Sequence, residues 1–165
     1  MSEKRSYPHP ETEADFVSIN IKAWCCASIG QFVVIAPDSN RQKIRWSAIG
    51  DGTDWPTVDS ADARTKQSSD QQFPAKFGVV TGISGTDFNA YVFQERAIWS
   101  MTYQGGDVVF SFDRFEEGRG CHRVNRFVAV DEAVFFESQY GYHLVQGNQV
   151  TDIGYGIVDK SYTPT

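Results

Sequence analysis

Two groups of side chains in this chain invite a chemical interpretation, and the first is a cysteine followed by two basic residues, Cys121-His122-Arg123. A phosphatase-type loop needs a cysteine, five intervening residues and then an arginine at the start of a helix, so that the thiolate and the guanidinium meet one phosphate. Here Phe127 takes the arginine's place, Arg126 comes one residue early, and no helical pattern follows. The sequence therefore predicts a turn leading into a strand.

The second group is a set of acidic residues in one polar stretch: Asp51, Asp54, Asp59 and Asp62. Calcium loops place their ligands at alternate positions, and this spacing does not match that pattern. The segment from Ser47 to Trp55 is similar to the Asp-box of sialidase propellers, but Ile49 replaces its aspartate and Trp55 lies one residue late. We expect solvated loop carboxylates and no metal site.

Other signatures of catalysis or cofactor binding are missing from the sequence. Its three histidines, His9, His122 and His143, lack metal-ligand spacing, and it has neither a phosphate-binding loop nor a Gly-x-Ser-x-Gly elbow. The three cysteines are odd in number and two of them, Cys25 and Cys26, are adjacent, which indicates a protein that folds with reduced thiols. We predict no catalytic residues, no cofactor and no metal.

The composition is that of one globular domain. The 165 residues are 41% hydrophobic and 14% aromatic, which is too apolar for disorder. A net charge of −6 argues against a surface that wraps nucleic acid. The polar N-terminus does not resemble a signal peptide, and no apolar run approaches the roughly 18 residues that a membrane span requires.

The elements that must position these residues are predicted to be strands. Apolar residues alternate with period two at 16–21, 31–36, 43–49, 78–83, 89–94, 97–103, 107–115, 126–130, 133–137, 142–145 and 153–158, with turn residues between these segments. No convincing helical repeat occurs. Residues 1–15 are predicted to be an N-terminal arm, and residues 16–165 a single β domain. The polar stretch at 50–76 is predicted to be a long surface loop of the kind that often binds partners.

Three hairpins resemble one another, at 32–50, 90–103 and 132–147. Each pairs an apolar strand with a strand that carries a central aromatic residue, namely Trp46, Trp99 and Tyr142. A spacing of about 40 to 50 residues between such units is typical of propeller blades. We expect three blade-like units of antiparallel strands, a partial β-propeller, in which these aromatic residues pack between sheets; a β-sandwich or barrel is the alternative.

Three blades are too few for a closed ring, which uses roughly four to eight. The blades at the two ends of such a chain need a neighbour to cover them. We therefore expect the protein to associate with itself or with a partner.

Several segments together resemble the phage tail hub and nozzle family, which stabilise packaged DNA and connect head to tail. They include Ile44-Arg-Trp-Ser47 with Gly50-Asp51 and Trp55, Tyr91-Val-Phe93 with Ala97–Met101, Phe110–Phe115 with Gly118–Cys121, and Ala133–Phe136 with Tyr140-Gly-Tyr142. The resemblance covers about residues 30–155. Family members are usually much longer than this chain and form complete propellers.

The resemblance implies a virion structural protein of a tailed bacteriophage, at the tail or head–tail junction, assembled in the host cytoplasm. Its partners would be copies of itself, with six-fold rings favoured, other tail, portal or adaptor proteins, and DNA that passes without specific binding; no membrane is implied. Asp54, Trp55 and Phe73 are the candidate interface residues. The rival hypothesis is a carbohydrate-binding module in which Trp55 or Tyr140 stacks on a sugar. A glycan depolymerase would need paired carboxylates facing one cleft, which the sequence does not show.

Overall fold

The computed structural model describes residues 21–85 and 89–153, and within these ranges the protein is built almost entirely from antiparallel β-sheet. The described strands form three four-stranded sheets, none of them closed into a barrel, so the all-β prediction is confirmed. The predicted N-terminal arm at 1–15 lies outside the described residues.

Each sheet takes its four strands in chain order. The first sheet contains β1 (Ala23–Ile29), β2 (Phe32–Pro37), β3 (Lys43–Trp46) and β4 (Ser69–Gln72). The second contains β5 (Val80–Gly85), β6 (Asn89–Gln94), β7 (Ala97–Tyr103) and β8 (Phe110–Glu117). The third contains β9 (Phe127–Val130), β10 (Ala133–Ser138), β11 (Gly141–Gln146) and β12 (Gln149–Ile153).

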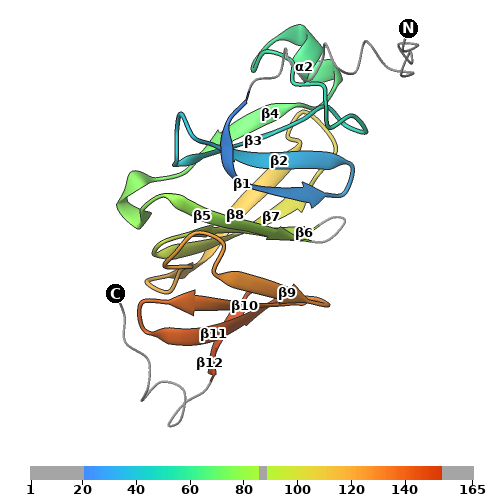
Figure 1. The fold of residues 1–165 in the computed structure, drawn as a ribbon. Helices are drawn as coiled ribbons and strands as arrows, with labels where there is room; N and C mark the ends of the chain where they lie inside the picture. Colours follow the sequence, from blue (N-terminus) through green and yellow to red (C-terminus); the bar gives the residue numbers. More distant parts are fainter. Residues whose placement is uncertain (1–20, 86–88, 154–165) are drawn as a thin grey trace, which may run out of the picture.

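Short turns give each sheet its meander order. Several neighbouring strands are joined by only two residues, which forces them to pair as hairpins. Gly30 between β1 and β2 and Gly147 between β11 and β12 have φ of 55° and 59°, a left-handed conformation that glycine adopts without steric cost. Figure 1 shows the result, in which the three sheets follow one another from the first to the last.

The three similar hairpins of the sequence occupy equivalent places in the three sheets. Residues 32–46 form β2 and β3, residues 90–103 fall in β6 and β7, and residues 133–146 form β10 and β11. In every sheet these are the two central strands. The sequence similarity therefore reflects a repeated structural unit, a four-stranded antiparallel meander.

The larger apolar core lies between the first and second sheets. Val34 and Ile44 from the first sheet are buried there with Val92 and Met101 from the second. Trp46 adds an edge-on contact with Phe110, with ring centroids 5.1 Å apart. Alternation along each strand places these side chains on the facing surfaces, and their burial is the main stabilising contribution here.

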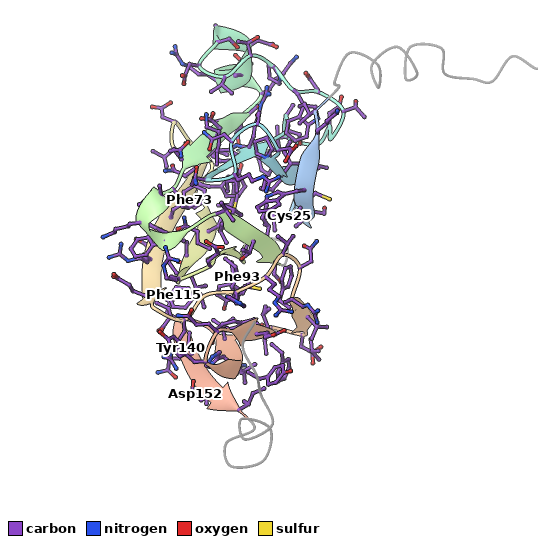
Figure 2. The ribbon with its side chains drawn as sticks, turned by 60° about the vertical axis from the view of Figure 1, so that its left-hand side comes forward. Cys25, Phe73, Phe93, Phe115, Tyr140 and Asp152 are labelled. Atoms are coloured by element: carbon purple, nitrogen blue, oxygen red, sulfur yellow. The ribbon has the colours of Figure 1, made fainter. Side chains whose placement is uncertain are left out.

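A second, smaller core lies between the second and third sheets. Phe93 packs against Phe136 with ring centroids 5.3 Å apart and stacks on Phe127 at 5.5 Å. Figure 2 shows Phe93 and Phe115 on the side of the second sheet that faces the third. A Cβ atom at Gly82 would overlap the Phe127 ring, so only glycine lets β5 approach β9 this closely.

The prediction of one long loop at 50–76 is wrong. The stretch contains α2 (Ala61–Thr65), the edge strand β4 and the 3₁₀ turn η1 (Ala75–Phe77). The Ser60 side chain caps α2 by accepting a hydrogen bond from the Ala63 amide. β4 carries only polar residues because it lies at an edge, where pairing with β3 requires backbone groups and no apolar side chains.

Strand boundaries also differ from the predicted ones at both ends of the described chain. The first described strand is Ala23–Ile29, whereas the sequence predicted a strand at 16–21, of which residues 16–20 lie outside the described residues. The last described strand is Gln149–Ile153, whereas the prediction began at residue 153. Both are edge strands without clear alternation, since β1 is apolar at nearly every position and β12 mixes polar and apolar residues.

Candidate assembly surface

The predicted interface residues lie at the first sheet, and only part of the set is accessible. Asp54 and Trp55 follow β3 and are partly exposed, with the Asp54 carboxylate 2.7 Å from the Lys66 ammonium group. Phe73 is only 2% exposed and packs against Trp99 and Phe112 between the first and second sheets. Figure 2 shows it inside the molecule. Phe73 cannot contact a partner, so its prediction as an interface residue is wrong.

Residues 51–58 fold back over the outer face of the first sheet, the face that points away from the second sheet. Arg45 on β3 holds them there, because its guanidinium group donates hydrogen bonds to the carbonyl oxygens of Trp55 (3.2 Å) and Pro56 (2.8 Å). The same guanidinium lies 5.7 Å from the centre of the Trp55 ring. Ile35, opposite Arg45 on β2, is only 6% exposed as a result. We call this surface the capped face.

The turn that begins the capping segment is organised by one aspartate. Asp51 Oδ1 accepts hydrogen bonds from the backbone amide of Thr53 (2.9 Å) and from its hydroxyl (2.6 Å). These bonds are the main reason that the pKa of Asp51 lies below its ordinary value. Trp55 closes the turn by donating from Nε1 to the Gly52 carbonyl. The segment that is similar to an Asp-box thus forms a compact turn, in which Asp51 has a structural role.

The outer face of the third sheet, at the opposite end of the molecule, carries a group of apolar side chains, two of which are more than half exposed. In the third sheet the register places Val128, Phe135 and Leu144 side by side, and Val130 beside Ala133. Their neighbours Val134, Phe136 and Val145 point into the second core, so these five side chains point outward. Val128 is 57% exposed and Val130 51%. Ala133, Phe135 and Leu144 are half-buried, and the same face also carries polar side chains from β10, β11 and β12. We call the five apolar residues, together with Ile153 on β12, the terminal face.

The three repeated aromatic residues do not have equivalent surroundings. Trp46 is buried and Trp99 half-buried, and both point into the gap between the first and second sheets, although one comes from each side of it. Tyr142 points outward beside the terminal face and is 38% exposed. The prediction of packing between sheets therefore fits Trp46 and Trp99, and it is wrong for Tyr142 in the described residues.

A serine, a histidine and an aspartate form a hydrogen-bonded chain in the third sheet that the sequence did not reveal. Ser138 Oγ lies 2.5 Å from His143 Nε2, and His143 Nδ1 lies 2.6 Å from Asp152 Oδ1. The order is that of a hydrolase triad, but Ser138 is fully buried and its hydroxyl oxygen accepts the Tyr140 amide at 3.0 Å. A nucleophile must reach its substrate, and the buried Ser138 hydroxyl cannot. These hydrogen bonds therefore have a structural role, which is to join β10, β11 and β12.

Asp152 also joins the third sheet to the segment that precedes it. Arg119 donates to Asp152 at 2.9 Å and to Glu116 at 2.7 Å. Burial raises the pKa of Asp152, but the hydrogen bonds from Arg119 and His143 outweigh it and hold this pKa below its ordinary value. The alternation of β11 places His143 on the inner face, but only the β11–β12 register brings Asp152 opposite it.

The cysteine that suggested a phosphatase loop is inert. Cys121 is fully buried, and burial raises the pKa of its thiol to about 11, so the thiolate is scarce at neutral pH. Its Sγ donates to the carbonyl oxygen of Arg123 at 3.1 Å. The segment lies between β8 and β9 without forming a helix, as the sequence predicted.

The potential metal ligands, the helices and the comparisons with known proteins indicate no further function for the described residues. No group of three or more potential metal-ligating side chains occurs within the described ranges 21–85 and 89–153. In those ranges no helix is long and apolar enough to span a membrane. No protein-family model and no curated protein matches the chain.

Proposed function

We propose that the chain is a structural subunit of a tailed-phage virion, located at the tail or the head–tail junction, and that it works by assembly with copies of itself and with neighbouring proteins around the DNA channel. The single observation that carries this proposal is the terminal face. Val128 and Val130 are exposed on a sheet that ends the described stack, and a neighbour that removed them from water would stabilise an assembly.

The arrangement of the sheets supports the propeller-type interpretation on which the resemblance depends. Each sheet is a four-stranded meander, as a propeller blade is. The first strands of consecutive sheets lie near each other, β1 beside β5 and β5 beside β9, as the inner strands of blades do around an axis. Closed propellers use at least about four blades. Three such sheets are therefore suited to a role in which other subunits complete the structure.

The experiment that tests this proposal places the protein in particles. Purified virions of the phage that encodes the chain are analysed by quantitative mass spectrometry, and an epitope-tagged copy is located by immunogold electron microscopy. We expect the chain at a fixed copy number, with label where the tail joins the head. Its absence from purified particles, or label over the capsid shell, would overturn the proposal.

A carbohydrate-binding module is the second candidate, and one observation favours it. Tyr140, in the turn between β10 and β11, is 64% exposed and offers an aromatic surface for a sugar ring. Figure 2 shows it at one end of the third sheet, where β10 turns into β11. Binding of the purified protein to a glycan array, lost in Tyr140→Ala and kept in Trp55→Ala, would favour this function over assembly.

A further inference from the structure

A groove of about 700 Å³ lies on the outer side of the first sheet, beside the segment 51–58 that covers part of that face. β3 contributes Lys43 and Arg45 to its lining, β4 contributes Asp70, and Val58 belongs to the covering segment. A volume of this order is typical of clefts that take a ligand of many atoms, and it is far larger than a single ion needs.

The groove carries more positive than negative charge. The Lys43 ammonium group is paired with Asp70 at 2.7 Å, and Asp38 at the rim is paired with Arg41 at 2.9 Å. Two further cations line the groove, Lys22 and Arg45, and neither forms an ion pair with a carboxylate of the described residues.

Arg45 is the more telling of these two cations, because it is half-buried. Its hydrogen bonds go to two uncharged acceptors, the carbonyl oxygens of Trp55 and Pro56. A charge that is partly removed from water is stabilised by an opposite charge beside it. The groove is therefore suited to an occupant that carries carboxylates.

The chain itself enters the described structure at this groove. Ile21 and Lys22 line it, and the Lys22 carbonyl oxygen accepts a hydrogen bond from the Asp38 amide at 2.8 Å, which fixes the chain there just before β1. Residues 16–20 carry no charge, so the first charged residues reached by going back along the sequence are Asp15, Glu13 and Glu11. These three lie six to ten residues before Ile21, a distance that an extended chain spans in roughly 20–35 Å.

From these observations we infer that residues 11–15 dock in this groove of their own chain, with their carboxylates beside Lys22 and Arg45. Attachment at Ile21 favours them over any free occupant, because a short tether gives an effective concentration in the millimolar range. With segment 51–58, they would extend the cover of the first sheet. The inference goes beyond the proposed virion role and does not depend on it.

The first experiment detects the contact in the unaltered full chain. A carbodiimide joins a carboxylate to a lysine amine that touches it, and mass spectrometry of the monomer identifies the linked peptides. The pair of Lys43 and Asp70 is the internal positive control. We expect links from residues 11–15 to Lys43 and none to Lys76, an exposed lysine on η1. Equal linking to both lysines, or linking to Lys76 alone, would overturn the inference.

The second experiment tests whether charge holds the segment in the groove. A spin label is attached to Ala14→Cys in a Cys26→Ser background, since Cys25 and Cys121 are buried. Nuclear magnetic resonance then measures the broadening of backbone amide signals. We expect the strongest broadening at Lys43, Val58 and Asp70.

Two sets of substitutions in this labelled chain are compared. Glu11→Gln, Glu13→Gln and Asp15→Asn together should lower the ratio of docked to undocked molecules about ten-fold or more, so that the broadening at the groove is largely lost. The matched control, Lys4→Gln with Arg5→Gln, changes charge farther along the same segment and should leave the broadening intact. Circular dichroism verifies that all variants fold.

Three outcomes of the labelling experiment would refute the inference. Broadening that is no stronger at the groove than at Lys76 would show that the segment does not dock. Broadening that survives the triple substitution would show that the carboxylates do not hold it. Broadening that appears only when labelled protein is mixed with unlabelled, isotope-enriched protein would show that the segment of a neighbouring copy fills the groove.

Discussion

The two ends of this molecule differ in how the outer face of the last sheet is covered. A stack of sheets always leaves two outer faces, and at the first sheet the chain covers part of one of them with its own residues 51–58. Arg45 fastens that cover through two backbone carbonyls. At the third sheet the described chain leaves Val128 and Val130 more than half exposed. Figure 1 shows the two ends, with α2 beyond the first sheet and β12 at the far side of the third.

The difference shows that side chains between sheets are apolar in every sheet, because each inner face packs against another sheet. The side chains on an outer face depend instead on what covers that face. The central strands of all three sheets carry apolar residues toward the adjacent sheet. On their outer sides, the first sheet has Lys43 and Arg45, and the third has Phe135 and Leu144. A covered charged group needs a polar partner of its own, as Arg45 finds in two carbonyl groups, and an apolar face needs an apolar cover. The composition of each end thus indicates what should cover it.

The largest effect that we predict is a difference in stability between substitutions on the two sides of β10. Phe136→Ala should lower the free energy of unfolding by about 3–5 kcal/mol, because it leaves a cavity beside Phe93 in the second core. Phe135→Ala, at the adjacent position on the terminal face, should cost less, about 1–2 kcal/mol, because Phe135 is half-buried and part of its ring stays in contact with water. Urea denaturation of both variants measures the difference. Equal losses would mean that Phe135 is covered within the monomer.

A second prediction concerns how closely the third sheet is held to the second. Gly82→Ala should destabilise the protein by about 1–3 kcal/mol, because its new methyl group would overlap the Phe127 ring and push β9 away from β5. Gly106→Ala is the matched control, since a Cβ atom there meets no heavy atom within 4 Å. Thermal unfolding of the two variants measures the effect. A Gly82→Ala protein as stable as the control would show that the sheets can separate slightly without loss.

A third prediction tests the cover of the first sheet. Arg45→Met keeps most of the apolar stem of the side chain and removes both hydrogen bonds to the 51–58 segment, so we expect a loss of about 1–2 kcal/mol. Hydrogen exchange should become faster at the amides of residues 51–58 and stay unchanged in β10 and β11. Arg64→Met removes one exposed hydrogen bond, to the Asp59 carbonyl oxygen just outside this segment, and should leave exchange at residues 51–58 unchanged. Unchanged exchange at 51–58 in Arg45→Met would show that other contacts hold the cover.

Much of the fold could be predicted from the sequence because its central strands are buried on at least one face. The hairpins at 32–50, 90–103 and 132–147 show strong alternation, and each proved to be the middle of a sheet. The edge strands β4 and β12 were missed or misplaced, since an edge strand needs only one partner and little apolar pattern. β1 was missed because its residues are nearly all apolar and do not alternate with polar ones. Phe73 was assigned to the surface because its neighbours in sequence are polar, although the chain turns inward at that residue.

The assembly surface was harder to predict, because alternation shows which residues share a face and not what that face meets. Tyr142 belongs to the same kind of hairpin as Trp46, yet it points outward because no fourth sheet follows in the described chain. The chain of Ser138, His143 and Asp152 depends on the pairing register of three strands, which side-chain spacing alone does not give.

The smallest effect that we predict is a pH dependence at the third sheet. Asp152→Asn should remove a few tenths to about 1 kcal/mol at neutral pH, because the Asp152 side chain is 59% exposed and solvent weakens its ion pair with Arg119. The folded-state pKa of Asp152 lies below its ordinary value of 3.8, so its contribution is present above pH 3.8 and is lost as the pH falls below that value. The stability difference between wild type and Asp152→Asn should therefore vanish in strong acid, as measured by urea denaturation between pH 7 and pH 2. Asp113→Asn, on the exposed side of β8, is the matched control for the substitution itself. A difference that persists below the pKa would mean that Asp152 acts through hydrogen bonds that its protonated form keeps, and that charge has no part in fastening β12.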